Sequence, residues 1–235
     1  MVALQASIGA LNDLVDAPGD AGRKPGKPIP AGHVTRTQAR LVVAVGAGIG
    51  VGLAGVSSPG LALLGIAILA IGYAYDLRAK GTALSWLPFA VGIPLLPVFG
   101  WYGVEGSLPA AFGILLPVAV VAGAGLAIAN ARADWERDLD AGLDSVAIRL
   151  GLLRAWVVEA ALLGGVMGVA TGSLWLRGGD PGALLATVVA GAVVAAGLMV
   201  GRVADPARRE RAWEVEAIGV ALLAVAWLVG YGALD

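Results

Sequence analysis

The chain has 235 residues, of which 58% are hydrophobic and only 14% are charged, whereas a soluble domain carries about 25% charged residues. Apolar residues run through the whole length, which excludes a soluble protein that carries only a signal peptide or a single anchor. The net charge of −1 argues against a nucleic-acid-binding surface, and the absence of cysteine excludes disulfides, thiolate metal sites and cysteine nucleophiles.

A series of apolar segments makes up most of the chain. The first, residues 2–11, is too short to cross a bilayer, because a spanning helix needs ~20 residues. Seven longer segments follow, at residues 41–56, 61–75, 84–102, 110–129, 155–176, 183–203 and 212–234. Lipid admits only helices or closed barrels, and these runs lack the alternation of barrel strands. The sequence therefore predicts an all-α, polytopic transmembrane helical bundle with seven full spans and one truncated N-terminal span.

Two of the predicted spans are rich in glycine. The glycines are Gly46, Gly48, Gly50, Gly52 and Gly55 in the span 41–56, and Gly164, Gly165, Gly168 and Gly172 in the span 155–176. Small residues at such spacings let helix backbones approach closely in lipid. We expect both sets to pack against neighbouring helices.

The joints between the spans alternate in charge. Only Arg177, of the 16 Lys and Arg residues, falls in the short joints at 56–60, 103–108 and 177–182. The others fall in the longer joints at 12–40, 76–82, 130–154 and 202–211. Because successive spans alternate in direction, the longer joints share one face, and the positive-inside rule predicts that this face is cytoplasmic. We therefore expect a multi-pass integral protein of the cell membrane.

Two of the cationic joints also contain regularly spaced Asn and Asp residues. These residues are Asn12, Asp13, Asp16 and Asp20 in the first joint, and Asn130, Asp134 and Asp138 in the second. In a helix, each set would share one face. Each joint precedes a similar succession of hairpins and a shorter basic joint. The sequence thus predicts one membrane-embedded domain, residues 1–235, made of two pseudo-repeats with Asp-rich loops at 12–32 and 130–151.

Oxygen ligands without His or Cys suit a hard cation such as Mg²⁺, which binds a few carboxylates, water and substrate phosphates. The same joints carry the cations Arg23, Lys24, Lys27, Arg78, Lys80, Arg132 and Arg137. Carboxylates, a metal and basic side chains can together bind a diphosphate and neutralise it as it leaves. The alternative from the residues alone is a pair of solvated, charged loops.

Three motifs in these joints have the order and spacing of a known family. Residues 12–20 read NDxxDxxxD and are followed by KPIPAG at 27–32, residues 75–80 read YDLRAK, and residues 130–142 read NxxxDxxxDxxxG before SVAIRLG at 145–151. Together they resemble the signatures of the UbiA superfamily of intramembrane prenyltransferases. The resemblance covers nearly the whole chain.

The resemblance implies nine transmembrane helices around a central cavity, and two Mg²⁺ ions that bind a polyprenyl diphosphate. Carried over, the metal ligands are Asn12, Asp13, Asp16, Asp20, Asn130, Asp134 and Asp138. The diphosphate would contact Lys27, Tyr75, Arg78 and Lys80, and the catalytic residues would be Asp16, Asp134 and Asp138. The chain departs from the family in having Lys27 in place of an arginine and in lacking the first helix, so we expect a misassigned start or a fragment.

The resemblance implies that the protein transfers a prenyl group from the diphosphate to an acceptor. An aromatic ring in quinone-type biosynthesis is the expected acceptor, and a glycerophosphate lipid or another acceptor is the alternative. A UbiA-type terpene cyclase, in which the cation is quenched internally, also remains open. Outside enzymes, the alternatives are a transporter with carboxylate cation sites and a degenerate scaffold. The expected partners are the donor, the acceptor and the bilayer, without nucleic acid.

Overall fold

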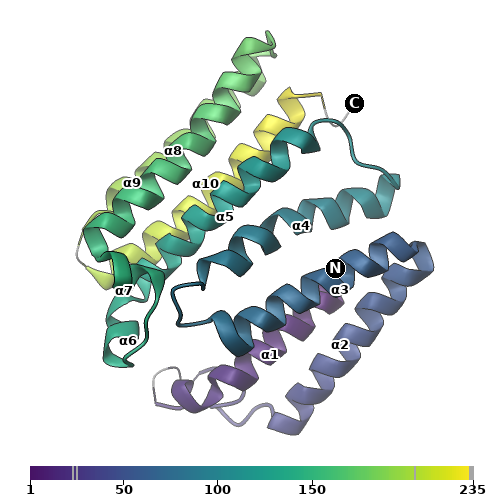
Figure 1. Cartoon of the computed structure of the whole chain (residues 1–235), viewed down its shortest axis with the longest axis vertical. Helices are drawn as coiled ribbons and strands as arrows, with labels where there is room; N and C mark the ends of the chain where they lie inside the picture. The colour runs from purple at the N-terminus through teal and green to yellow at the C-terminus, as the bar shows by residue number, and fades with distance from the viewer. Residues whose placement is uncertain (23, 25, 204, 233–235) are drawn as a thin grey trace. The chain divides into compact units, whose positions relative to one another are not determined.

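The computed structural model describes residues 1–22, 24, 26–203 and 205–232 (Figure 1). Arg23 and the end of the predicted span 212–234 lie outside these residues. The described chain is helical and contains no strand. Its elements are α1 (Val2–Asp20), α2 (Arg36–Ser57), α3 (Pro59–Ala74), the π-helical turn η1 (Tyr75–Ala79), α4 (Trp86–Glu105), α5 (Phe112–Ala133), α6 (Trp135–Asp140), α7 (Val146–Leu150), α8 (Leu152–Leu176), α9 (Pro181–Gly201) and α10 (Pro206–Gly230).

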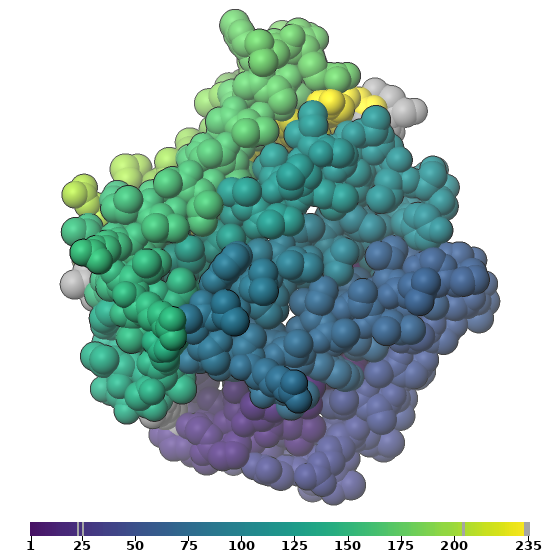
Figure 2. Space-filling view, viewed as in Figure 1, coloured from purple at the N-terminus to yellow at the C-terminus, as the bar shows by residue number. Residues whose placement is uncertain are grey.

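Seven of the described helices are long and apolar enough to cross a membrane: α2, α3 extended by η1, α4, α5, α8, α9 and α10. They match the seven predicted segments one for one, which confirms the all-α bundle. The outward side chains suit lipid, because contiguous exposed apolar surface marks membrane contact. On α8, whose green atoms lie at the surface in Figure 2, Leu153 is 68% exposed and Trp175 is 71% exposed.

The N-terminal helix differs from the prediction. The sequence predicted that the apolar segment would end at Leu11 and give way to a loop, but α1 continues as a helix through the acidic stretch to Asp20. The helix passes Pro18 in its last turn. Lysines from other parts of the chain neutralise the carboxylates of this turn, so the helix does not end where the apolar residues end.

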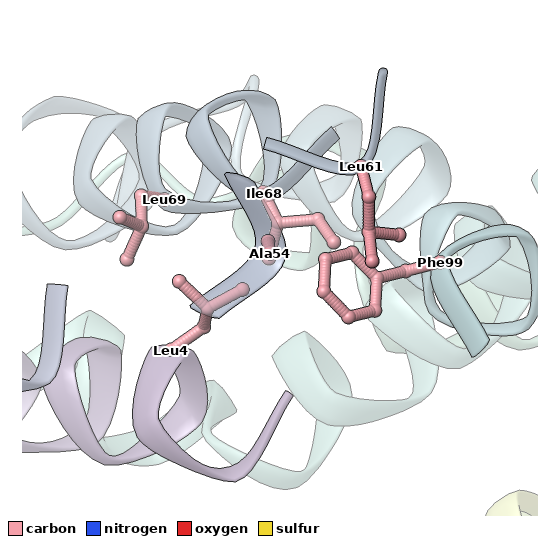
Figure 3. Packing of buried hydrophobic residues seen from close by; sticks show 6 residues of the cluster. All are labelled: Leu4, Ala54, Leu61, Ile68, Leu69 and Phe99. Atoms are coloured by element: carbon pink, nitrogen blue, oxygen red, sulfur yellow. The ribbon is translucent and has the colours of Figure 1, made fainter. Parts of the chain in front are cut away.

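The chain divides into two compact units, and the first comprises Met1–Lys80 and Leu95–Leu108. Here α1 packs against α2 and α3. The core contains Leu4, Ala54, Leu61, Ile68, Leu69 and Phe99, all at most 8% exposed (Figure 3). On α1, the buried Ser7 hydroxyl donates to the carbonyl of Val43 in α2 at 2.6 Å and lies 2.6 Å from the hydroxyl of Tyr73 in α3. These contacts fix α1 against both neighbours just before its acidic turn.

Close approach of α1 and α2 depends on two glycines. A Cβ at Gly46 would lie 2.8 Å from the carbonyl oxygen of Ala3, and one at Gly50 would lie 2.5 Å from Leu4 Cδ2. The packing prediction therefore holds for these two. It is wrong for Gly48 and Gly52 of α2 and for the four glycines of α8, where an added Cβ would meet nothing within 4 Å in the described chain. Glycine spacing alone does not tell which face of a helix meets a neighbour.

The second unit comprises Gly81–Pro94 and Pro109–Asp235. Its most buried span is α5, which packs against α8 and α10, while α9 packs against α8 and α10 (Figure 1). At Gly123 of α5 a Cβ would lie 2.8 Å from the carbonyl oxygen of Phe89, so α4 approaches α5 backbone to backbone there. This central position of α5 matters because its C-terminal end carries the second acidic stretch.

Candidate functional site

The first acidic stretch forms one face of α1. Asp13, Asp16 and Asp20 follow each other at three and four residues, so their side chains share one side of the helix. The Asp side chains are partly exposed, at 32%, 21% and 14%. The helical condition of the sequence prediction is thus met at the first stretch.

Two lysines from outside α1 converge on these carboxylates. Lys27 Nζ lies 2.8 Å from Asp20 Oδ2, 3.1 Å from Asp13 Oδ1 and 3.7 Å from Asp16 Oδ2. Lys80 Nζ donates to both oxygens of Asp16, at 2.7 and 2.5 Å. Both lysines pair with the aspartates in this structure, and their contact with a diphosphate, which the family resemblance implies, stays a prediction.

The environment of Lys27 favours its charge. Partial burial opposes the ammonium form, but hydrogen bonds and attraction from Asp20 and Asp13 outweigh that effect and hold the pKa of Lys27 above its ordinary value. A single ammonium surrounded by three carboxylates marks a place that suits a cation. It is the strongest indication in the described chain that this cluster can accept a metal.

The π-helical turn η1 adds a carboxylate that the sequence analysis did not assign. Asn12 Nδ2 donates to Asp76 Oδ1 at 2.8 Å, and Asp76 is only 4% exposed. Because Asn12 donates through its amide nitrogen, its carbonyl oxygen is not used in this contact. A signal was present in the sequence, since an ionisable residue at the end of an apolar span is a functional candidate.

The remaining predicted diphosphate contacts lie on the same turn. Tyr75 begins η1 and is half-buried, and its carbonyl accepts the backbone N–H of Lys80 at 2.9 Å. Arg78 is exposed, and no ion pair within the described residues joins it to an acidic group. The first unit therefore gathers Asn12, the aspartates and both lysines, with Arg78 on the adjoining surface.

The second acidic stretch lies at a break between two helices. α5 ends at Ala133, Asp134 has φ −90° and ψ 2°, and α6 begins at Trp135. The helical bonding pattern nevertheless continues, because the N–H of Asp134 donates to the carbonyl of Asn130 at 3.1 Å and that of Asp138 donates to the carbonyl of Asp134 at 2.9 Å. The condition that the second stretch be helical is thus met only in part, because the helix breaks at Asp134, although the i, i+4 hydrogen bonds are kept.

The cations around the second stretch have different roles. Arg137 pairs with Asp134 and is exposed. Arg132, which the sequence analysis counted among the cations of these joints, is 3% exposed and pairs with the fully buried Glu159 of α8 at 2.6 Å. Arg132 therefore serves the interior of the second unit rather than a surface-bound diphosphate.

No group of three His, Cys, Asp or Glu residues within the described ranges has the geometry of a ready metal site. In the first cluster the carboxylates are turned toward lysine ammonium groups. The donor set fits a hard cation nonetheless: three carboxylates and one amide oxygen come from a single face of α1, beside the buried Asp76 Oδ2 that has no hydrogen-bond partner in the described chain. The first unit thus offers the right donors in an arrangement held by lysines.

Comparison with known families identifies the chain. The model of the UbiA prenyltransferase family matches residues 1–218. The chain belongs to the UbiA prenyltransferase family. It is accordingly a prenyltransferase and, with seven apolar helices among the described residues, an integral membrane protein. This confirms the resemblance seen in the motifs. No curated protein matches the chain significantly.

Solved structures of UbiA proteins share the fold. A digeranylgeranylglyceryl phosphate synthase has a TM-score of 0.74 at 16% identity, over 97% of this chain and 81% of its own. A UbiA homologue from Aeropyrum pernix K1 has a TM-score of 0.73 at 19% identity, over 97% of this chain and 86% of its own. A UbiA homologue from Archaeoglobus fulgidus bound to GPP and Mg²⁺ has a TM-score of 0.61 at 18% identity, over 94% and 84%. At these identities the likeness concerns the fold.

Proposed function

We propose that the protein transfers a prenyl group from a polyprenyl diphosphate to an aromatic ring of the quinone-biosynthesis type, with Mg²⁺ as cofactor. The observation that carries the proposal is the cluster on α1, where Lys27 and Lys80 hold the aspartates of a family signature. The carboxylates are the ligands that Mg²⁺ prefers, and the lysines are groups that bind a diphosphate, so the cluster contains both parts of a metal–diphosphate site. The Archaeoglobus fulgidus homologue bound to GPP and Mg²⁺ supports the same donor and metal.

In the proposed site each acidic stretch holds one metal ion. The ligands are Asn12, Asp13, Asp16 and Asp20 for one ion, and Asn130, Asp134 and Asp138 for the other. When bound, Mg²⁺ would neutralise the negative charge that develops on the leaving diphosphate. Because a metal ion would compete with the lysines for the aspartates, metal binding would release Lys27 and Lys80. The freed ammonium groups, with Arg78 and the Tyr75 hydroxyl, then bind phosphate oxygens.

The reaction breaks the bond between C1 of the prenyl chain and the bridging oxygen, and the electron pair stays on the diphosphate. The allylic cation then accepts a π-electron pair from the aromatic ring, which forms a new C–C bond. Loss of the ring proton to water or to a base restores aromaticity, and diphosphate leaves. Asp16, Asp134 and Asp138 are the proposed catalytic residues because they would hold the ions that stabilise the leaving group.

A glycerophosphate-type acceptor is the second candidate, because one structural neighbour is a digeranylgeranylglyceryl phosphate synthase. Its hydroxyl oxygen would attack the same cation and lose its proton. The full chain in lipid nanodiscs distinguishes the candidates when it is supplied with Mg²⁺ and a prenyl diphosphate, first without an acceptor and then with a hydroxybenzoate and a glycerophosphate together. A prenylated hydroxybenzoate-type ring is the expected product. A prenyl ether of a glycerophosphate would overturn the aromatic acceptor, and a cyclic product formed without acceptor would overturn transfer.

We also propose that the acidic stretches face the cytoplasm from the plasma membrane. The support is the charge bias, since the four longer joints, two of which contain the acidic stretches, carry 15 of the 16 Lys and Arg residues.

A further inference from the structure

In the last turn of α5, the buried Arg132 makes hydrogen bonds to α8 and α9. Arg132 Nη1 donates to Glu159 Oε2 of α8 at 2.6 Å, and Nη2 donates to the carbonyl of Gly201, the last residue of α9, at 2.5 Å. Arg132 and Glu159 are 3% and 0% exposed. A Cβ at Gly201 would lie 3.1 Å from Ala212 Cβ and 3.8 Å from Arg132 Nη1, so the glycine leaves its carbonyl accessible to the guanidinium.

A second buried arginine, Arg209 of α10, makes hydrogen bonds on both sides of the break between α5 and α6. Arg209 is 2% exposed, and its Nε donates to the carbonyl of Arg132 at 2.9 Å. Its Nη2 donates to both oxygens of Glu136 in α6, at 2.6 and 2.5 Å. Asp134 therefore lies between Arg132, which contacts α8, α9 and α10, and Glu136, which contacts α10.

The short helix after the break needs such support. α6 has six residues, and helices of that length are not stable by their own hydrogen bonds. Buried ion pairs add little net stability compared with apolar packing, but they select one geometry, because a guanidinium left without its partner in an apolar interior is very costly. Because the guanidinium is planar, arginine also fixes the direction of its hydrogen bonds.

We propose that Arg132, Glu159 and Arg209 are positioning residues that hold Asn130, Asp134 and Asp138 in the arrangement that binds the second metal ion. The inference rests on the proposed function, since it assigns these residues to the same site. None of the three touches substrate or metal in the proposal. They act through the backbone of Arg132 and the side chain of Glu136, one on each side of Asp134.

The test measures Mn²⁺ binding to the full chain in nanodiscs, from the electron paramagnetic resonance signal of free Mn²⁺, without substrate. Asp16→Asn should remove binding of the first ion and Asp134→Asn binding of the second, so these variants show which binding event belongs to which acidic stretch. Glu159→Gln should lower the affinity of the second ion ~10–100-fold, the usual effect of removing a group that orients a metal ligand, and leave the first ion unchanged. Asp144→Asn is the matched control, because it also breaks a carboxylate–arginine pair of this unit, but an exposed one.

A second variant keeps the test decisive if Glu159→Gln fails to fold. Glu136 is 46% exposed, and a glutamine there keeps a carbonyl oxygen that can accept a hydrogen bond from the buried Arg209. Glu136→Gln therefore weakens this contact without removing it, and it should lower the affinity of the second ion several-fold. Wild-type affinity for the second ion in both variants would overturn the inference and leave the proposed function intact. Equal weakening of both ions would also overturn it, because that indicates general destabilisation. Failure of the wild-type chain to bind Mn²⁺ would overturn the proposed function itself.

Discussion

Replacing Lys27 with Met should strengthen binding of the metal ion and weaken binding of the prenyl diphosphate. Lys27 Nζ lies 2.8 Å from Asp20 and 3.1 Å from Asp13, and its side chain is 26% exposed. Each partly exposed ion pair contributes about 0.2–1 kcal/mol, so the two close contacts together oppose metal binding by ~0.4–2 kcal/mol. Without Lys27 the first metal ion should therefore bind about two- to thirtyfold more tightly in the absence of diphosphate.

The same substitution should raise KM for the prenyl diphosphate, because the released ammonium is the proposed phosphate contact. Mn²⁺ titration without substrate and steady-state kinetics at saturating Mg²⁺ measure the two effects. Lys24→Met is the matched control: it removes an equal charge from the same segment, and the Lys24 side chain makes no ion pair within the described chain. Unchanged or weaker metal binding in Lys27→Met would refute the idea that this lysine occupies the place of a cation.

Three further predictions follow from single features of the chain. Gly50→Val should destabilise the protein by about 1–3 kcal/mol through overpacking, measured by thermal unfolding in detergent, whereas Gly48→Val should be nearly neutral, because a Cβ there meets nothing within 4 Å. The chain has no cysteine, so Ser57→Cys should react with an impermeant thiol reagent on intact cells and Asp140→Cys only after permeabilisation; the reverse pattern would contradict the topology. The Asp144 pKa is lowered by the hydrogen bond from its arginine partner, so the stabilisation it provides is present above the ordinary Asp pKa and lost as pH falls through the lowered value; the melting-temperature difference between wild type and Asp144→Asn should shrink on acidification.

The membrane spans could be predicted from the sequence because each depends on a local property, the length of an apolar run. The first acidic stretch was harder. Whether residues 12–20 form a helix depends on Lys27 and Lys80, which lie outside the stretch and neutralise its carboxylates. The motif identified the residues, but composition did not reveal that lysine and aspartate would be in contact.

The interior of the second unit was not predictable in the same way. Arg132 looked like its neighbours in a charged joint, and its burial follows from Glu159, which is 27 residues away on another helix. Glu159 gave a signal, as an ionisable residue inside an apolar span, but its partner could not be named from the sequence. Asp76 was part of a recognised motif, yet its contact with Asn12 depends on the π-helical turn.

The central claim is that both acidic stretches serve one diphosphate-releasing reaction. Release of diphosphate from a prenyl diphosphate by the full chain, with Mg²⁺ and acceptor, tests it most directly. Asp16→Asn and Asp134→Asn should each reduce release to the background level, while Asp140→Asn, an exposed carboxylate beside the second stretch, should retain it. Full release by either of the first two variants would contradict the account.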